Sequence, residues 1–197
     1  MEITLTDISK KFGKHQIIKN FSYSFGGSSN YIVCGKNGSG KSTLLKLISK
    51  WMSPNDGKIT WNGADATKEE ELISFAAPYI ELPETSTVQE IVSLHFKIRK
   101  MLEKQTALFD LPFIKSNKNK TYQDLSSGMK QKLKLILCLF SDAQLYLLDE
   151  PSTNLDARGV EDYKEMLKIL PEKRILIIAS NEEKDYNFLP NYKVIQL

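Results

Sequence analysis

Eight consecutive residues near the start of the chain carry the clearest chemical pattern in the sequence. They are Gly35, Lys36, Asn37, Gly38, Ser39, Gly40, Lys41 and Ser42. Their order fits the phosphate-binding pattern G-x-x-x-x-G-K-[ST], in which glycines let backbone N–H groups approach phosphate oxygens. Lys41 can reach the β and γ phosphates of a nucleotide, and the Ser42 hydroxyl can hold Mg²⁺. The motif therefore predicts a site for a nucleoside triphosphate with Mg²⁺.

The segments on either side of this loop have the character that the pattern requires. Residues 31–34 are a short apolar run typical of a buried strand, and the residues from Thr43 to about Lys50 are typical of a helix. The positive end of that helix would point at the same phosphates as the loop. We therefore expect a strand, a glycine-rich loop and a helix in that order.

A second chemical feature is an apolar run that ends in two acidic residues. Residues 145–148 are hydrophobic, and Asp149 and Glu150 follow directly. The carboxyl end of a parallel strand is the usual side for ligands. There Asp149 can hold Mg²⁺, directly or through water, and Glu150 can orient or deprotonate an attacking water. The pair predicts the catalytic half of the site.

The composition indicates an ordinary globular chain. With 197 residues, 41% hydrophobic, the chain suits one domain, and the net charge of +3 gives no reason to expect binding to nucleic acid. Cys34 and Cys138 lie in apolar runs, which favours buried free thiols in a reducing cytosol over a disulfide or a metal site. No signal peptide is expected, and the longest apolar run, 135–140, is too short to span a bilayer. We expect any membrane part to belong to a partner.

The remaining segments predict how these sites are held. We expect antiparallel strands over 3–6 and 17–25 around a basic turn at 10–14, a further strand at 58–61, and a strand at 175–179. Helices are expected over 86–101, 126–139 and 158–170, and the first has a capping box of either Ser86 with Gln89 or Thr87 with Glu90. The basic stretch 115–120 is interpreted as a surface loop, and His95 as a packed or interface residue.

Strands alternate with helices from residue 31 onward, apart from a mainly helical insertion at about 84–140. This alternation predicts an α/β fold with a mainly parallel core sheet flanked by helices. An antiparallel β subdomain would precede it, and the helical insertion would form a second subdomain within a single domain, residues 1–197.

Several of these motifs together resemble the ATP-binding-cassette (ABC) ATPases. Residues 35–42 resemble the Walker A loop, 125–131 (LSSGMKQ) the signature motif, 145–150 Walker B with its catalytic glutamate, and 152–156 the D-loop. Phosphate loops occur in many NTPases, but a signature motif directly before Walker B is particular to this family. The resemblance covers nearly the whole chain.

The resemblance implies a mechanism. Two cassettes would dimerise head to tail, as a homodimer or a heterodimer, with two ATP molecules between them. Ser126 and Gly128 of one chain would contact the γ phosphate held by the loop of the other. Phe12 matches the aromatic position that stacks on adenine, although its position alone favours core or sheet-edge packing. ATP and Mg²⁺ would then be held by the loop, Thr43, Phe12, Ser126, Gly128 and Asp149. The cycle would drive a membrane permease from the cytoplasmic face of the cell membrane.

Four positions depart from the family pattern. Pro78 stands where the family has a glutamine that senses Mg²⁺ and the permease, and its neighbour Ala77 has no side-chain oxygen either. Asn181 follows Ser180 where the family has a switch histidine. An asparagine can donate a hydrogen bond to phosphate but carries no charge. Ser127 and Met129 replace a glycine and a glutamine in the signature.

Two hypotheses follow for the function. The first is a hydrolysing ATPase subunit of an ABC transporter, with Glu150 and Asn181 as catalytic residues. The alternative is an ATP-gated module that dimerises but hydrolyses slowly or not at all, because loss of one well-placed donor costs about 10²–10³ in rate. A soluble ABC protein acting on DNA or ribosomes is a third hypothesis, less favoured because the chain has neither two cassettes nor long insertions.

Overall fold

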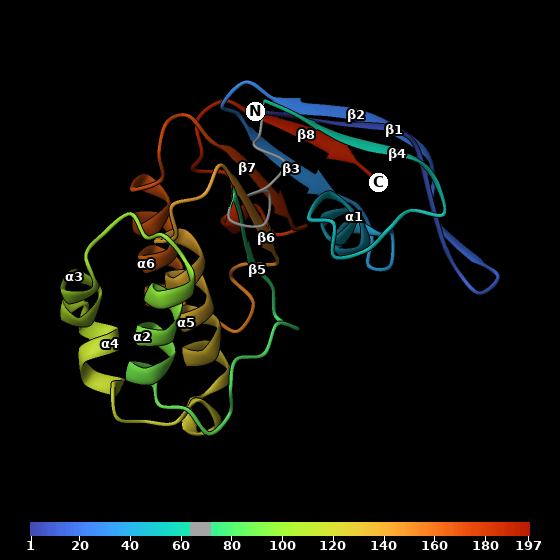
Figure 1. Cartoon of the computed structure of the whole chain (residues 1–197). Coiled ribbons are helices and arrows are strands. Elements are labelled where there is room, and N and C mark those ends of the chain that lie inside the picture. Colours follow the sequence, from blue (N-terminus) through green and yellow to red (C-terminus); the bar gives the residue numbers. More distant parts are fainter. Residues whose placement is uncertain (64–71) are drawn as a thin grey trace.

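The computed structural model describes residues 1–63 and 72–197, and within these residues the strands form a parallel sheet and an antiparallel sheet (Figure 1). The strands are β1 (Glu2–Phe12), β2 (His15–Gly26), β3 (Asn30–Cys34), β4 (Asp56–Asn62), β5 (Ile73–Ala76), β6 (Leu145–Asp149), β7 (Ile175–Ala179) and β8 (Tyr192–Gln196). The helices are α1 (Lys41–Ile48), α2 (Val88–Ile98), α3 (Gln105–Asp110), α4 (Pro112–Asn117), α5 (Ser127–Leu139) and α6 (Ala157–Lys168).

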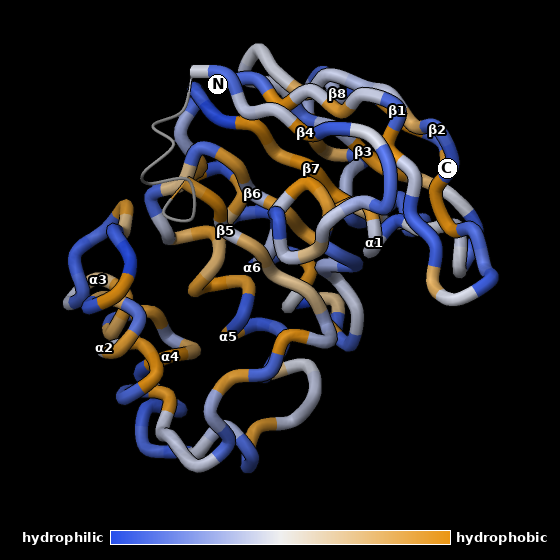
Figure 2. Tube along the Cα trace, turned by 45° about the vertical axis from the view of Figure 1, so that its right-hand side comes forward, coloured by the Kyte–Doolittle hydropathy of each residue, from blue (hydrophilic) through white to orange (hydrophobic). Residues whose placement is uncertain are grey.

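The parallel sheet has the strand order β5-β6-β7-β3-β8. The strands β6 and β7 are buried along their whole length, as their uninterrupted apolar sequences require. Figure 2 shows hydrophobic residues following the central strands of this sheet. Because all neighbouring pairs are parallel, the loops after β3, β6 and β7 leave the sheet at the same edge. These are the loops that carry the predicted chemistry.

Successive side chains of each buried strand point to opposite faces of the sheet. On one face, Leu147 packs with Leu44 of α1 and with residues of the antiparallel sheet. On the other face, Leu148 packs with Leu133 of α5 and Tyr163 of α6. The sheet is therefore covered on both sides, which confirms the expected arrangement of helices around a parallel core.

The antiparallel sheet has the order β2-β1-β4 and corrects one prediction. The turn expected at 10–14 is shorter, because β1 continues through Phe12, which pairs directly with His15. Only two residues connect the strands, and Gly13, with φ of 57°, provides the left-handed backbone that such a tight hairpin needs.

The expected helical insertion contains α2 to α5, which lie together away from the antiparallel sheet (Figure 1). Of the two capping boxes considered, Thr87 with Glu90 is the one that forms. The interpretation of 115–120 as a loop is wrong for its first three residues, which belong to α4. A proline in the first turn of α4 and the buried Ile114 favour this helix over a loop. The elements α3, α4 and β8 were not predicted.

Two further sequence expectations concern the cysteines and the membrane. Cys34 and Cys138 are both free thiols, the first half-buried and the second buried. Across residues 1–63 and 72–197, no helix is both long enough and apolar enough to cross a membrane. Whether the chain is a single domain over 1–197 stays a prediction.

Candidate nucleotide-binding site

The glycine-rich loop runs from the end of β3 into α1 and is closely packed. Gly40 precedes α1 with φ of 105°, and a Cβ at this position would lie 2.9 Å from the Ile17 side chain. At Gly35, a Cβ would lie 2.5 Å from the Ser39 hydroxyl. Among the residues that the structure describes, no side chain caps the start of α1, so its first N–H groups remain available to an anion.

Lys41 lies beneath this loop with only 6% of its surface exposed. Its ammonium group donates to the carbonyl oxygen of Gly35 at 2.7 Å and approaches that of Lys36 at 3.4 Å. The hydroxyl of Ser39, a residue of the loop itself, is buried and has no hydrogen-bond partner within the described residues. A buried cation, open helix N–H groups and an unpartnered hydroxyl together suit a polyphosphate.

Asp149 ends β6 and is 2% exposed. Both of its carboxylate oxygens are buried, and neither has a hydrogen bond of full geometry to any described residue. Burial raises the pKa of Asp149, while the nearby hydroxyls of Ser42 and Tyr79 oppose this effect. An uncompensated buried carboxylate beside a serine hydroxyl fits Mg²⁺, a hard cation that prefers oxygen ligands. Ser42 and Asp149 would hold this ion, which would neutralise charge on the phosphates.

Glu150 and Asn181 follow the adjacent strands β6 and β7. Glu150 is exposed, and its φ of 45° lies in the left-handed region that non-glycine residues rarely adopt. Its N–H donates to the carbonyl oxygen of Ala179 at 2.8 Å, which holds it beside β7. Asn181 accepts a hydrogen bond from the Gly35 N–H at 3.0 Å through Oδ1. The asparagine thus joins the end of β7 to the phosphate loop, and its amide N–H₂ is the group that could donate to phosphate.

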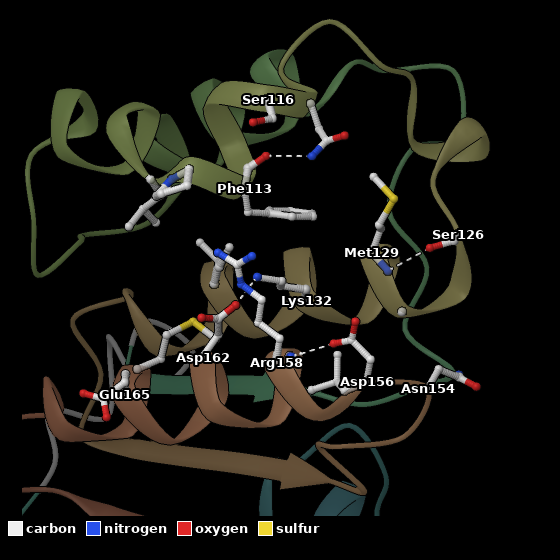
Figure 3. Close-up of a pocket in the computed structure, with 18 of the residues that line it drawn as sticks. Phe113, Ser116, Ser126, Met129, Lys132, Asn154, Asp156, Arg158, Asp162 and Glu165 are labelled. Atoms are coloured by element: carbon white, nitrogen blue, oxygen red, sulfur yellow. Dashed lines mark hydrogen bonds and ion pairs between the residues drawn. The ribbon is translucent and has the colours of Figure 1, made fainter.

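The signature residues lie at a different place, at the start of α5 (Figure 3). Ser126 caps this helix by accepting a hydrogen bond from the Met129 N–H at 3.3 Å. Gly128 packs so closely on the D-loop that a Cβ there would lie 2.5 Å from the Asn154 carbonyl oxygen. Both line a groove of about 900 Å³ between α4, α5 and α6. Among the described residues, none of the phosphate loop lines this groove. A single chain therefore keeps its signature residues apart from its own phosphate loop.

The model of the ABC transporter family matches residues 18–153, which include the phosphate loop, the signature residues and both acidic residues. The chain belongs to the ABC transporter family. This confirms the sequence-based identification of an ABC cassette.

Individual proteins agree with this assignment. The chain is 31% identical over 163 residues to the Nod factor export ATP-binding protein I of Rhizobium johnstonii, covering 78% of this chain and 52% of that protein. It is 30% identical over 179 residues to a sulfate/thiosulfate import ATP-binding protein of Synechococcus elongatus, covering 87% and 52%. An ABC transporter ATP-binding protein from Pyrococcus furiosus superposes with a TM-score of 0.78 at 26% identity, covering 98% and 97%.

These matches confirm the fold class and the ATP-binding assignment of this ABC cassette. The cassette spans about half the length of the two curated relatives. One of these is named for export and the other for import.

Phe12 and Pro78 occupy two positions at which the ABC family has a characteristic residue. Phe12 lies at the end of the β1–β2 hairpin and is 46% exposed, so the core interpretation of this residue is wrong. Stacking on adenine stays a prediction. The carbonyl oxygen of Pro78 accepts a hydrogen bond from the Lys134 ammonium at 2.8 Å. Pro78 therefore anchors the segment after β5 to α5 through its backbone.

Sequence reasoning missed three residues around the site. Tyr79 follows Pro78 and lies beside Asp149. Gln131 is buried and donates to the carbonyl oxygen of Pro151 at 2.9 Å, which ties α5 to the loop after Glu150. The buried Asp185 accepts a hydrogen bond from the Ser180 hydroxyl at 2.5 Å. Gln131 is the last residue of the signature stretch 125–131, and this position could have indicated its importance. Nothing in the sequence around Asp185 distinguishes it from acidic residues of the surface.

Proposed function

We propose that this cassette is the ATP-hydrolysing, nucleotide-binding subunit of an ABC transporter, acting as a head-to-tail dimer at the cytoplasmic face of a membrane. The observation that carries the proposal is the separation of the phosphate loop from the signature groove. Each half offers groups suited to phosphate, but a single chain does not bring them together. A second cassette supplies the missing half in a symmetric arrangement.

Within such a site, each group has a distinct task. The loop amides and Lys41 bind the phosphates, and Ser42 with Asp149 holds Mg²⁺. Glu150, which is exposed at the edge of the sheet, orients or deprotonates water for attack on the γ phosphorus. The Ser126 hydroxyl and the N–H groups at the start of α5 in the second cassette face the γ phosphate and exclude water.

The dimer is tested by sedimentation velocity of the full chain. Glu150→Gln with Mg²⁺ and ATP is expected to double in mass, because nucleotide stays trapped between two cassettes. Adding Ser126→Arg to that variant should leave it monomeric while ATP binding to the loop persists. A Glu150→Gln chain that stays monomeric at every protein concentration, with ATP bound, would contradict the proposal.

A separate surface supports a membrane partner. Large hydrophobic side chains are exposed around a groove of about 550 Å³ beside α2, among them Trp51 at 62% and Ile98 at 63%. Leu94, on the same helix, is 49% exposed. Clustered apolar exposure of this kind marks interaction sites. We propose that a permease subunit covers this groove, as the predicted role of the helical insertion implies.

The partner surface is tested by co-purification from detergent-solubilised membranes with a permease candidate co-expressed. Ile98→Ser should weaken capture at least tenfold, because a buried apolar anchor at the interface is lost. Val194→Ser is the matched control, since Val194 is also a β-branched residue and is 56% exposed on β8. Equal loss with both variants, or with neither, would contradict the assignment of this surface.

The alternative of an ATP-gated module without turnover is less well supported. Both curated relatives are named ATP-binding proteins of transport systems, and Glu150 stands at the predicted catalytic position.

A further inference from the structure

Asp185 is a buried acid to which the proposed hydrolysis gives no task. It ends the short 3₁₀ turn η3 (Glu183–Asp185) and is 1% exposed, although the two residues before it are exposed. Burying a carboxylate costs free energy unless its oxygens are bonded. The backbone carbonyl oxygen of Asp185 accepts a hydrogen bond from the Tyr163 hydroxyl at 3.0 Å, and its carboxylate Oδ2 accepts one from the Ser180 hydroxyl at 2.5 Å. The backbone bond fixes where Asp185 lies, and the carboxylate acts on Ser180.

The Ser180 hydroxyl connects this carboxylate to the chain on the far side of Asn181. Ser180 follows β7, is fully buried, and donates through its N–H to the carbonyl oxygen of Val33 at 3.2 Å. Its hydroxyl accepts a hydrogen bond from the Glu182 N–H at 2.9 Å. A hydroxyl has one proton to give, and this proton goes to Asp185, which leaves a lone pair for the Glu182 N–H. Asn181 therefore lies between two residues that the same hydroxyl holds.

The Asn181 side chain is exposed but has a defined orientation. Its Oδ1 lies 3.0 Å from the backbone nitrogen of Gly35, and because an N–H group can only donate, the atom facing it must be the oxygen of the amide. The N–H₂ group is then the part of the side chain that is left to donate. The Gly35 carbonyl oxygen accepts a hydrogen bond from the Lys41 ammonium at 2.7 Å. One glycine therefore anchors both the buried cation of the phosphate loop and the asparagine amide.

We infer that Asp185 and Ser180 are positioning residues for Asn181: the hydrogen bond between them fixes the backbone on both sides of the asparagine, which keeps its Oδ1 on the phosphate loop and presents its N–H₂ group to phosphate. The inference rests on the proposed function, because that function gives Asn181 a phosphate to donate to. An uncharged donor acts through an aligned hydrogen bond, so its direction matters more than that of a cation. This requirement gives the buried acid a use.

The positioning is tested without nucleotide, by amide hydrogen exchange of the full chain measured by NMR. The Gly35 N–H reports on the Asn181 side chain, which is its acceptor. Ser180→Ala should speed exchange at Gly35 about tenfold, as Asn181→Ala does by removing the acceptor itself. Ser180→Thr keeps the hydroxyl and should protect Gly35 as in the parent chain. Ser141→Ala is the matched control, because it also removes a fully buried hydroxyl that donates at 2.7 Å, and it should leave Gly35 unchanged.

The consequence for hydrolysis is tested by steady-state kinetics with Mg-ATP. Ser180→Ala should lower kcat at least about tenfold, a part of the 10²–10³ that loss of a well-placed donor costs. KM should stay within about twofold, because the phosphate loop is intact. Asp185→Ala reaches the same hydrogen bond from its other end and should have the same effects, so it decides the question if Ser180→Ala does not fold. The double variant should be no slower than the slower single variant, since both remove one bond.

Exchange at Gly35 as slow as in the parent chain, in either Ser180→Ala or Asp185→Ala, would overturn the inference. Equal effects in Ser141→Ala would overturn it as well, because they would trace the change to lost stability and not to Asn181. If the parent chain hydrolyses no Mg-ATP while Gly35 responds as expected, the proposed function has failed and the positioning of Asn181 stands. The two failures are distinguishable, because the exchange measurement contains no nucleotide.

Discussion

His95 makes the stability of the cassette depend on pH. Its Nε2 lies 2.9 Å from the buried Ser141 hydroxyl, which itself donates to the Leu137 carbonyl oxygen at 2.7 Å. Since that hydroxyl has one proton to give, His95 Nε2 carries the proton in their shared hydrogen bond. Burial, with the positive charge of Arg99, lowers the pKa of His95 to about 4. The imidazole is therefore neutral in the folded chain at physiological pH.

The size of the stability loss at low pH follows from the difference in the pKa of His95 between the unfolded and the folded chain. In the unfolded chain the imidazole has its ordinary pKa of 6.5, and in the folded chain about 4. Between these values the unfolded state binds more protons, so stability falls as pH falls through this window. At pH 5 the expected loss from His95 alone is about 2 kcal/mol, and none is expected above about pH 7.

Urea unfolding at pH 7.5, 6.5, 5.5 and 5.0 measures this effect. Other groups also titrate in this range, so the comparison is with His95→Gln, which can still donate to Ser141. From pH 7.5 to pH 5.0 the parent chain should lose about 2 kcal/mol more than this variant. If the free energy of unfolding falls equally with pH in the parent and in His95→Gln, the reasoning is refuted. The parent chain would then not bind an extra proton at His95 on unfolding.

Two further predictions concern the loops around the site. Gly128→Ala should destabilise the chain by about 1–3 kcal/mol in urea unfolding, because its Cβ would lie 2.5 Å from the Asn154 carbonyl oxygen. The control is Ser127→Ala, at the exposed neighbouring position, which should destabilise the chain by under about 0.5 kcal/mol. Asp185→Ala should cost about 1–3 kcal/mol, since the buried Ser180 hydroxyl loses its 2.5 Å acceptor. Asp185→Asn keeps an acceptor oxygen and should lose less than half as much free energy of unfolding. Equal losses in the two variants would exclude Asp185 as the acceptor that stabilises Ser180.

The phosphate loop and the two acidic residues could be predicted because their signals are contiguous in the sequence. The loop pattern occupies eight neighbouring residues, and the acids directly follow a fully apolar strand. Asp149 and Glu150 then reach the loop because parallel strands bring their carboxyl ends to one edge. Asn181, two residues after the end of β7, was identified from the family pattern and not from a local signal of this kind.

The residues that reasoning missed depend on contacts between distant segments. Tyr79 lies beside Asp149 and under the Lys46 ammonium, and no local sequence pattern indicates these neighbours. The strand β8 was missed because four of its five residues are exposed, so its sequence lacks an apolar run. It forms through pairing with β3, which only the folded chain provides. The helix α4 was missed because three lysines in 115–120 suggested a loop.

The central claim is that each ATP site is built from two cassettes. It is tested most directly by mixing Lys41→Ala, which lacks its own phosphate-loop cation, with Ser126→Arg, whose signature groove is blocked. Neither variant alone should hydrolyse Mg-ATP. In an equal mixture, each dimer that pairs one variant with the other contains one intact site of two, so hydrolysis should reappear at up to about half the parent rate. No recovered hydrolysis in the mixture, or turnover by Ser126→Arg alone at the parent rate, would contradict the account.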